Sequence, residues 1–281
     1  MLWGTYGIFV KSLDYPAEHI IFFRYFFGFT GLLVFVAIKD GFAWVTLSAP
    51  DWKWLVLPAL FTGVSWLAYT YALKHTFVAN AVFLAYTAPV FTVLFAPFII
   101  KEKIEISSAI ALVFSLSGTL FIISYNTLFI GGGVLRGDLF ALFGGIIGGL
   151  IISFIKKVPS TLSGYRANMI ISGMIALALL PLYLRVGHSI TWQGYLLLLG
   201  MALVNQSLAT TMFYTGLRSI KAQHSAVLSY VDPLAATLMA SLILSESITL
   251  GSLIGGVLII AGGVLIVIKN KSVPSPEKFK M

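Results

Sequence analysis

Long apolar segments separated by short polar turns run through most of this chain. A transmembrane helix needs roughly 20 apolar residues, and in lipid only a helix or a closed barrel satisfies every backbone polar group. Nine segments meet this requirement between charges and turn residues, and residues 1–10 form a tenth that is too short to span. The segments predict an all-α integral membrane protein. The nine spans are residues 20–38, 54–73, 79–100, 107–125, 139–155, 167–184, 195–217, 222–244 and 250–268.

The scarcity of charge supports the same interpretation. Only 10% of the residues are charged and 59% are hydrophobic, whereas a soluble domain carries about 25% charged residues. A net charge of +8 would suggest a nucleic-acid partner in a soluble protein. Here the Lys and Arg residues lie between apolar segments, as loop charges do, so we expect a lipid bilayer and no nucleic acid. The chain has no cysteine, which excludes disulfides, Cys-ligated metals and cysteine nucleophiles.

The distribution of loop charges predicts the orientation. With ten spans and both termini on one side, thirteen of the 18 Lys and Arg residues fall on that side. Positive charge accumulates in cytoplasmic loops. We therefore expect a plasma-membrane protein with both termini in the cytoplasm and a basic cytoplasmic tail at residues 269–281. The charges expected outside are Lys11, Arg24, Lys74, Arg136 and Arg185.

The chain also contains an internal repeat at a constant offset of 144 residues. Five spans per copy is an odd number, so the second copy must insert upside down. Inverted repeats of this kind build many secondary transporters, with the substrate site near the midplane between them. We predict repeats at residues 1–126 and 137–268, with a turn or two of the first helix lying upstream of Met1. The matched pairs are Tyr86 and Tyr230, Pro89 and Pro233, Glu102 and Glu246, Ser108 and Ser252, and Gly118 and Gly262, with looser matches of Lys11 to Lys156 and Arg24 to Arg166.

Several short motifs recur in each half. A Trp-Gly pair precedes Lys11, and Arg24 opens the second span. The fourth helix of each repeat carries a proline and ends near a glutamate, as in "APVFTVLFAPFIIKE" and "DPLAATLMASLILSE". Gly118 and Gly262 lie in the fifth helices of the two repeats. In this order the motifs resemble the drug/metabolite transporter superfamily, specifically the EamA-type transporters. The resemblance implies ten helices, a central cavity, and exchange or proton-linked movement of small organic metabolites.

Polar and aromatic side chains inside the spans are candidates for the cavity. Asn205 and Gln206 lie near the middle of the eighth span, and Asn80 and His224 occupy matching positions in the fourth and ninth. Interhelical hydrogen bonds are worth about 0.6–2 kcal/mol, so helix packing is the alternative role for these side chains. The candidate lining residues are Trp66, Tyr69, Asn80, Tyr86, Asn205, Gln206, Tyr214, His224 and Tyr230.

The two prolines and Asp232 are costly within apolar helices. Pro89 and Pro233 each remove a helix hydrogen bond, which produces either a static bend or a hinge with a freed carbonyl at the cavity. Asp232 has no counterpart in the first copy, where Ala88 stands. Either it caps a half-helix restarting at Pro233, or it binds a proton or cation at the midplane.

Other charges and glycines receive structural interpretations. Glu102 and Glu246 are expected to cap the helices that follow them. Lys11 and Arg24 are expected near a membrane interface, as snorkelling residues or as an attraction for an anionic substrate. Because no basic cluster lies deep in the spans, a sugar phosphate is disfavoured. The patterns "GGIIGGL" and "GSLIG" predict close helix packing, while dimerisation stays open.

The expected function is secondary transport of a small organic metabolite, an amphipathic or aromatic compound such as an amino acid. No catalytic or nucleotide-binding motif occurs, so we expect no enzyme activity, cofactor or metal. The alternatives are an intramembrane enzyme, which would need paired acids or clustered histidines at depth, and a non-transporting scaffold, which would not need inverted half-sites. Monomer and homodimer are both left open.

Overall fold

The computed structural model describes residues 2–41, 52–99, 106–125, 128–129, 133–155, 157–159, 162–187, 189–219 and 231–269, and within these ranges the regular structure is helical. Its helices occupy ten positions, five in each half. The first half comprises η1 (Leu2–Thr5), α1 (Tyr6–Ser12), α2 (Ala17–Asp40), α3 (Lys53–His75), α4 (Val78–Ala85), α5 (Ala88–Ile99) and α6 (Ile106–Tyr125). The second comprises α7 (Leu135–Ile155), α8 (Gly164–Val186), α9 (Trp192–Met201), the π-helix η4 (Ala202–Ala209), α10 (Thr210–Ser219), α12 (Val231–Leu244) and α13 (Leu250–Lys269).

Four described helical segments are long and apolar enough to cross a membrane: Ala17–Asp40, Lys53–His75, Gly164–Val186 and Trp192–Gly216. Large apolar side chains also cover the outer surface, and Ile38, Leu177 and Leu242 are each more than 70% exposed. Exposed apolar side chains at this density suit a lipid environment. The fold is that of a multi-pass membrane protein.

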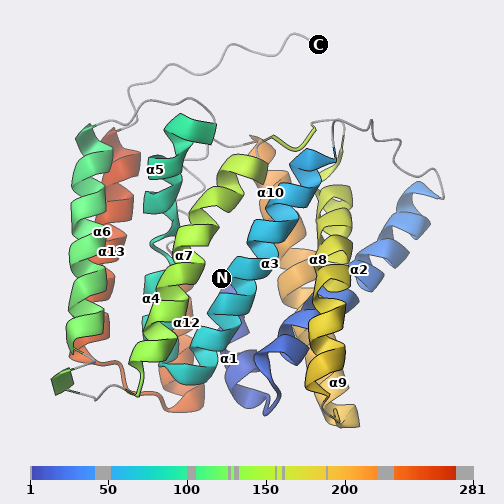
Figure 1. Ribbon diagram of the computed structural model, residues 1–281, viewed down its shortest axis with the longest axis horizontal. Helices are drawn as coiled ribbons and strands as arrows, with labels where there is room; N and C mark the ends of the chain where they lie inside the picture. Colours follow the sequence, from blue (N-terminus) through green and yellow to red (C-terminus); the bar gives the residue numbers. More distant parts are fainter. Residues whose placement is uncertain are drawn as a thin grey trace.

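The two halves pack reciprocally, as expected of inverted repeats. The first helix of the second half, α7, packs against α3, α4 and α5 of the first half, while η1 and α1 pack against α9, η4 and α12 of the second. In Figure 1, α3 runs from top to bottom, whereas the equivalent α9, η4 and α10 run from bottom to top. The fifth helices, α6 and α13, lie side by side at one end of the molecule (Figure 1).

Glycines set the closest helix contacts, and the predicted packing role of the two small-residue patterns is confirmed. A Cβ built at Gly145 of α7 would lie 2.7 Å from the Leu84 carbonyl oxygen of α4. One built at Gly255 of α13 would lie 2.6 Å from the Gly118 carbonyl oxygen of α6. Both patterns therefore bring helices of the same chain together.

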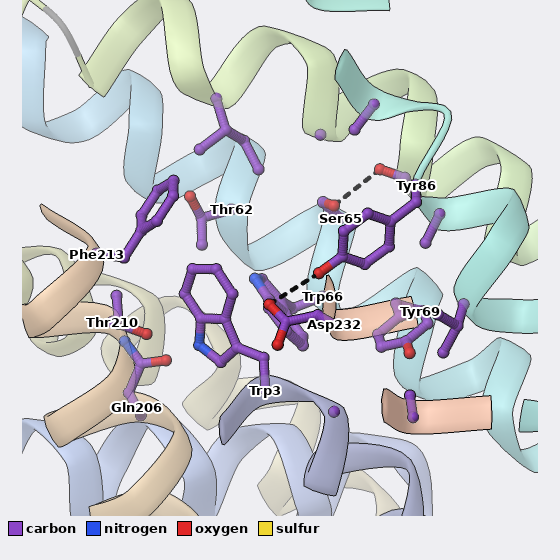
Figure 2. A pocket seen from close by; sticks show the side chains of 18 of the residues that line it. Trp3, Thr62, Ser65, Trp66, Tyr69, Tyr86, Gln206, Thr210, Phe213 and Asp232 are labelled. Atoms are coloured by element: carbon purple, nitrogen blue, oxygen red, sulfur yellow. Dashed lines mark hydrogen bonds between the residues drawn. The ribbon is translucent and has the colours of Figure 1, made fainter. Parts of the chain in front are cut away.

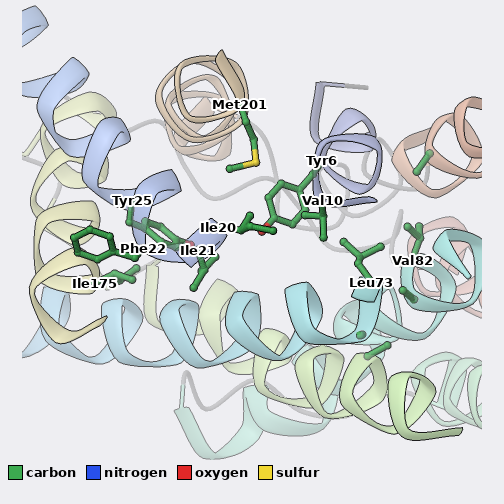
Figure 3. Close-up of a cluster of buried hydrophobic side chains, with 14 of the residues drawn as sticks. Tyr6, Val10, Ile20, Ile21, Phe22, Tyr25, Leu73, Val82, Ile175 and Met201 are labelled. Atoms are coloured by element: carbon green, nitrogen blue, oxygen red, sulfur yellow. The ribbon is translucent and has the colours of Figure 1, made fainter. Parts of the chain in front are cut away.

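The buried core lies where both halves meet. Figure 3 shows side chains from α1, α2, α3, α4, α8 and α9 converging around Tyr6, Ile20 and Met201. Burial of each large apolar side chain contributes roughly 1.5–3 kcal/mol in water, whereas in lipid dense packing takes over that role. This core fixes the helices that surround the cavity described next.

Candidate functional site

A cavity of about 200 Å³ lies between the two halves. Its wall is built by η1, α2, α3, α4 and α5 from the first half and by α7, η4, α10 and α12 from the second. Most of the wall is aromatic or aliphatic, with a few polar groups from Thr62, Ser65, Gln206 and Asp232 (Figure 2). This combination is typical of sites for small organic molecules, in which the polar groups fix the orientation.

One side of the wall is formed by a break in the fourth helix. The predicted continuous span at 79–100 is two helices, because α4 ends at Ala85 and α5 begins at Ala88. Pro89 has no N–H, so the Ala85 carbonyl is released from the helical ladder. Ala85 lines the cavity. The hydroxyl of Thr87 donates to the Leu84 carbonyl at 2.7 Å and satisfies the neighbouring backbone.

Asp232 contacts this break from the opposite half. The hydroxyl of Tyr86 donates to Oδ2 of Asp232 at 3.2 Å (Figure 2). Asp232 is only 8% exposed and belongs to the cavity wall. Because α12 begins at Val231, Asp232 lies in its first turn and does not precede the helix as the expected cap would. Pro233 follows within the same turn, and the residues before Val231 lie outside the described ranges.

The wall opposite contains a π-helical segment. In η4 the Asn205 carbonyl accepts from Nε1 of Trp3 at 3.1 Å and from Oγ1 of Thr210 at 3.0 Å. The side chain of Gln206 donates to Oδ1 of Asn168 at 2.9 Å and to Oγ of Ser172 at 3.0 Å. π-Segments are rare and occur often at functional sites. Here the segment joins η1 to the eighth helix and holds Gln206 at the cavity.

Arg24 lies directly behind the wall and is fully buried. Its Cζ lies 3.6 Å from the ring centroid of Trp66 and 4.4 Å from that of Tyr6. Trp66 is a wall residue, and so is Tyr25, the neighbour of Arg24 in α2. The expectation that Arg24 snorkels toward water is therefore wrong: its helix places the guanidinium inside the bundle, among aromatic rings.

Polar side chains from both halves meet in a cluster that we call the polar latch. It consists of Lys11, Thr76, Asn80, Asp138, Glu246 and Ser252. Lys11 Nζ lies 3.2 Å from Oε1 of Glu246 and donates to the Thr76 carbonyl at 2.8 Å. Oε2 of Glu246 accepts from the Val78 amide at 2.8 Å. Glu246 thus caps α4 of the other half, and α13 is capped instead by Thr249, whose Oγ1 accepts from the Ser252 amide at 3.0 Å.

The deeper part of the polar latch surrounds a buried acid. Oδ1 of Asp138 accepts from Oγ1 of Thr76 at 2.6 Å and from Nδ2 of Asn80 at 3.3 Å. Oδ1 of Asn80 accepts from the hydroxyl of Ser252. Asp138, Asn80 and Ser252 are all fully buried. The network joins α4, α7 and α13 at one end of the cavity.

The polar latch lies to one side of the cavity along the membrane normal. In α7, Gly144, Gly148, Ile151 and Ile155 line the cavity and Asp138 lies in the latch. In α4, Val82 and Ala85 line the cavity and Asn80 lies in the latch. Both latch residues are nearer the N-terminal ends of their helices, which point to the bottom of Figure 1. The latch therefore closes this end of the cavity.

Two predicted candidates lie away from the wall. Asn80 belongs to the polar latch, and Asn205 is buried with its Nδ2 donating to Oγ1 of Thr5 at 3.2 Å. His224 and Tyr230 lie outside the described residues, as does Glu102. The sequence patterns missed Asp138, noted Trp3 only as part of the Trp-Gly pair, and gave Arg24 as an interfacial residue or an attraction for an anionic substrate. The candidates on the wall are Trp66, Tyr69, Tyr86, Gln206, Tyr214 and Asp232.

Within the described residues, no three His, Asp or Glu side chains come together as metal ligands would. The charged groups at or directly behind the described wall are Arg24 and Asp232. Chemically, the site offers aromatic surface, amide and hydroxyl groups, one guanidinium and one carboxyl group.

The sequence is similar to those of known membrane transporters over most of its length. The sequence profile of the EamA-like transporter family matches residues 1–124 and again 135–268. An uncharacterized transporter of Archaeoglobus fulgidus is 29% identical over 93% of this chain and 91% of its own length. An uncharacterized transporter of Clostridium kluyveri is 29% identical over 88% and 82%. A solved crystal structure, 19% identical, superposes with a TM-score of 0.67 over 95% of this chain and 94% of the other, which shows a shared fold.

Proposed function

The chain belongs to the EamA-like transporter family, and from this membership we propose that it is a secondary transporter that moves a small organic metabolite through the cavity by alternating access. The family is one of membrane transporters, so neither an intramembrane enzyme nor a scaffold is retained. The observation that carries the proposal is the cavity itself, which is walled by both halves and closed at one end by the polar latch. A site at the interface of inverted repeats is where rocking of one half against the other exposes a substrate to each side in turn.

The size and lining of the cavity support the substrate class. About 200 Å³ suits a small metabolite, and the rings of Trp3, Trp66, Tyr69 and Phe213 offer apolar and π contact. Amino acids and other amphipathic compounds combine such a body with polar ends. Repeat boundaries at residues 1–126 and 137–268 remain part of this proposal.

We propose Asp232 as the coupling group. An intramembrane carboxyl group is costly and is functional by default. It contacts substrate space and also Tyr86 at the break in the fourth helix. Gain or loss of a proton there would change both the charge of the cavity and the hydrogen bond that joins the two halves.

The orientation follows from the loop charges. With both termini in the cytoplasm of a plasma-membrane protein, the polar latch faces outward and the described conformation is closed to the outside. Because Arg24 is buried in the bundle, it no longer counts among the loop charges on the outer side. The excess of Lys and Arg on the cytoplasmic side is therefore larger. An accessible tag at residue 281 in sealed right-side-out vesicles would contradict this orientation.

The test is counterflow in proteoliposomes. Purified protein is reconstituted with an unlabelled metabolite inside, and uptake of the labelled compound is followed for a panel of amino acids, organic acids and amines. We expect accumulation of at least one class above that of protein-free liposomes. Absence of counterflow for every class, with correctly folded protein in the vesicles, would overturn the proposal of metabolite transport.

A further inference from the structure

Arg24 is the one described charged side chain in the bundle that is fully buried without a hydrogen bond from its charged group. Its side chain is 0% exposed. None of Nε, Nη1 and Nη2 has a hydrogen-bond partner among the described residues. The guanidinium instead lies against aromatic faces, 3.6 Å from the centroid of Trp66, 4.4 Å from Tyr6 and 5.6 Å from Tyr25.

Aromatic contact offsets only part of the cost of burying this cation. A cation–π contact contributes about 0.5–2 kcal/mol, whereas a buried ion carries an effective penalty of several kcal/mol. Five N–H donors remain, and guanidinium groups match the two oxygens of a carboxylate in a planar, bidentate pair. Among the described residues, none supplies an anion to these donors.

The missing anion can arrive from the cavity. Trp66 and Tyr25 both line the cavity, so the guanidinium is one ring away from substrate space. On its other side the Trp66 ring meets Trp3 and Tyr69, whose centroids lie 6.4 and 5.6 Å away, and all three rings border the cavity (Figure 2). Rotation of the Trp66 side chain would open the guanidinium to a bound molecule.

The Tyr6 ring is held in place by a hydrogen bond to Thr70. The hydroxyl of Thr70 donates to the Trp66 carbonyl at 2.6 Å, so the Tyr6 hydroxyl, 2.6 Å from Oγ1 of Thr70, donates to Thr70. This chain of hydrogen bonds fixes the Tyr6 ring and the backbone of Trp66. The indole ring of Trp66 is the part of the cage that lies between the guanidinium and the cavity.

We infer that Arg24 is the site at which the transported substrate binds through a carboxylate group, with Trp66 as a ring that covers the guanidinium until substrate enters. The inference rests on the proposed transport function and names its substrate class. Asp232, on the wall contributed by the other half, supplies an acceptor for a positively charged end. The substrate class that satisfies both groups is an amino acid.

The charges favour a carboxylate over a phosphate. A phosphate monoester carries ≈ −1.5 to −2 charge, and the described wall sets against it one guanidinium and an acidic group, Asp232. A carboxylate carries a single charge, which Arg24 alone balances. Together with an ammonium group at Asp232, an amino acid leaves the cavity neutral.

Binding to the purified full-length chain tests the inference directly. The probes are L-leucine, L-phenylalanine and 4-methylpentanoate, each compared with its carboxamide, and inorganic phosphate. The readouts are the thermal melting temperature and tryptophan fluorescence, with Trp66→Phe identifying the signal that comes from the ring over Arg24. We expect at least one carboxylate to bind, its carboxamide to bind about 100-fold more weakly, and most of the fluorescence change to vanish in Trp66→Phe.

Two substitutions at Arg24 separate charge from fold. Arg24→Gln should weaken carboxylate binding by about 100-fold, whereas Arg24→Lys, which keeps the charge but loses the planar fork, should weaken it by about 10-fold. Arg166→Gln is the matched control and should leave binding unchanged, because Arg166 pairs with Asp40 at 2.8 Å and neither residue lines the cavity. If Arg24→Gln does not fold, Arg24→Lys still decides the question.

Several results would overturn the inference: carboxamides that bind as tightly as carboxylates, an Arg24→Lys variant with unchanged affinity, tighter binding of phosphate than of any carboxylate, or no binding by any probe. Counterflow separates the two proposals. Transport of amines or neutral compounds without carboxylates would leave the transport function and remove the role of Arg24. Carboxylate binding that depends on Arg24, without counterflow of any compound, would remove the transport function and keep the site.

Discussion

The ammonium group of Lys11 lies 3.2 Å from Oε1 of Glu246, so the first helix of one half is tied to the turn before the last helix of the other. Both side chains are mostly buried, at 26% and 17% exposed. We predict that Glu246→Gln or Lys11→Gln shifts the protein toward the conformation open at the latch end, by about 1 kcal/mol or roughly fivefold. The chain has no native cysteine, so a single cysteine replacing the wall residue Ala88 reports access by its rate of labelling with a membrane-impermeant thiol reagent.

Asp40→Asn is the matched control for the latch. It breaks the Arg166 ion pair, which has nearly the same exposure, 26% and 14%, but joins α2 to α8 away from the cavity. Labelling at residue 88 from the latch side should stay at the wild-type rate. Equal acceleration in Glu246→Gln and Asp40→Asn would mean that the latch does not hold the cavity closed.

Asp232 is predicted to carry the pH dependence of transport. Asp232→Asn keeps an oxygen that accepts from the Tyr86 hydroxyl, so we expect little change in melting temperature. Its transport rate should no longer vary with pH where the wild-type rate does. Tyr86→Phe, which removes the hydroxyl and keeps the acid, should retain the variation. A wild-type pH profile in Asp232→Asn would limit Asp232 to a structural role.

Asn80 is predicted to stabilise the fold without binding substrate. Asn80→Ala removes its hydrogen bonds to Asp138, Thr76 and Ser252 in a fully buried network, which should cost about 1–3 kcal/mol. We expect a lower melting temperature and an unchanged half-saturating substrate concentration. Tyr69→Ala, on the cavity wall, should raise that concentration instead. A changed half-saturation with normal stability in Asn80→Ala would place Asn80 in the substrate path.

The contact between α7 and the broken fourth helix gives a stability prediction with an internal control. An added Cβ at Gly145 would meet Oγ1 of Thr87 at 2.6 Å and backbone oxygens at 2.7 and 3.0 Å. Gly145→Ala should therefore destabilise the protein by about 1–3 kcal/mol. Gly200→Ala in α9, with no atom within 4 Å of the new methyl group, should be neutral or stabilise by up to about 1 kcal/mol. Thermal unfolding in detergent compares the two.

Much of the architecture was predictable because lipid permits few alternatives. The length of apolar segments located the helices, and the paired Tyr, Pro and Glu residues at one offset revealed the repeat. The break at Pro89 was foreseen as a kink, since a missing N–H is a covalent property. The π-helix η4 was not foreseen, because its extra residue per turn is held by Trp3 and Thr210, which come from other elements.

The candidate site was predicted less well, because burial of charge depends on tertiary contacts. Counting loop charges placed Arg24 among the charges on the outer side of the membrane. In the structure it is buried in the helix bundle, against the aromatic faces of Tyr6 and Trp66. Asp138, which follows Arg136 at the start of a span, was not singled out in the sequence. Its depth is set by the hydroxyl and amide groups of Thr76 and Asn80, which no local pattern connects to it.

The aromatic cage of Arg24 also bears on the order of assembly. A lone Arg in an inserting helix costs up to about 2.5–3.5 kcal/mol at the centre of the bilayer, yet α2 is otherwise long and apolar enough to enter the bilayer. The rings that cover the cation come from α1, α2 and α3. We therefore expect the cation to be shielded once the first 75 residues have left the ribosome and inserted. Lys11, in contrast, can form its ion pair only after Glu246 has been made, near the end of synthesis. The first half thus stabilises its own most costly residue before its partner half exists.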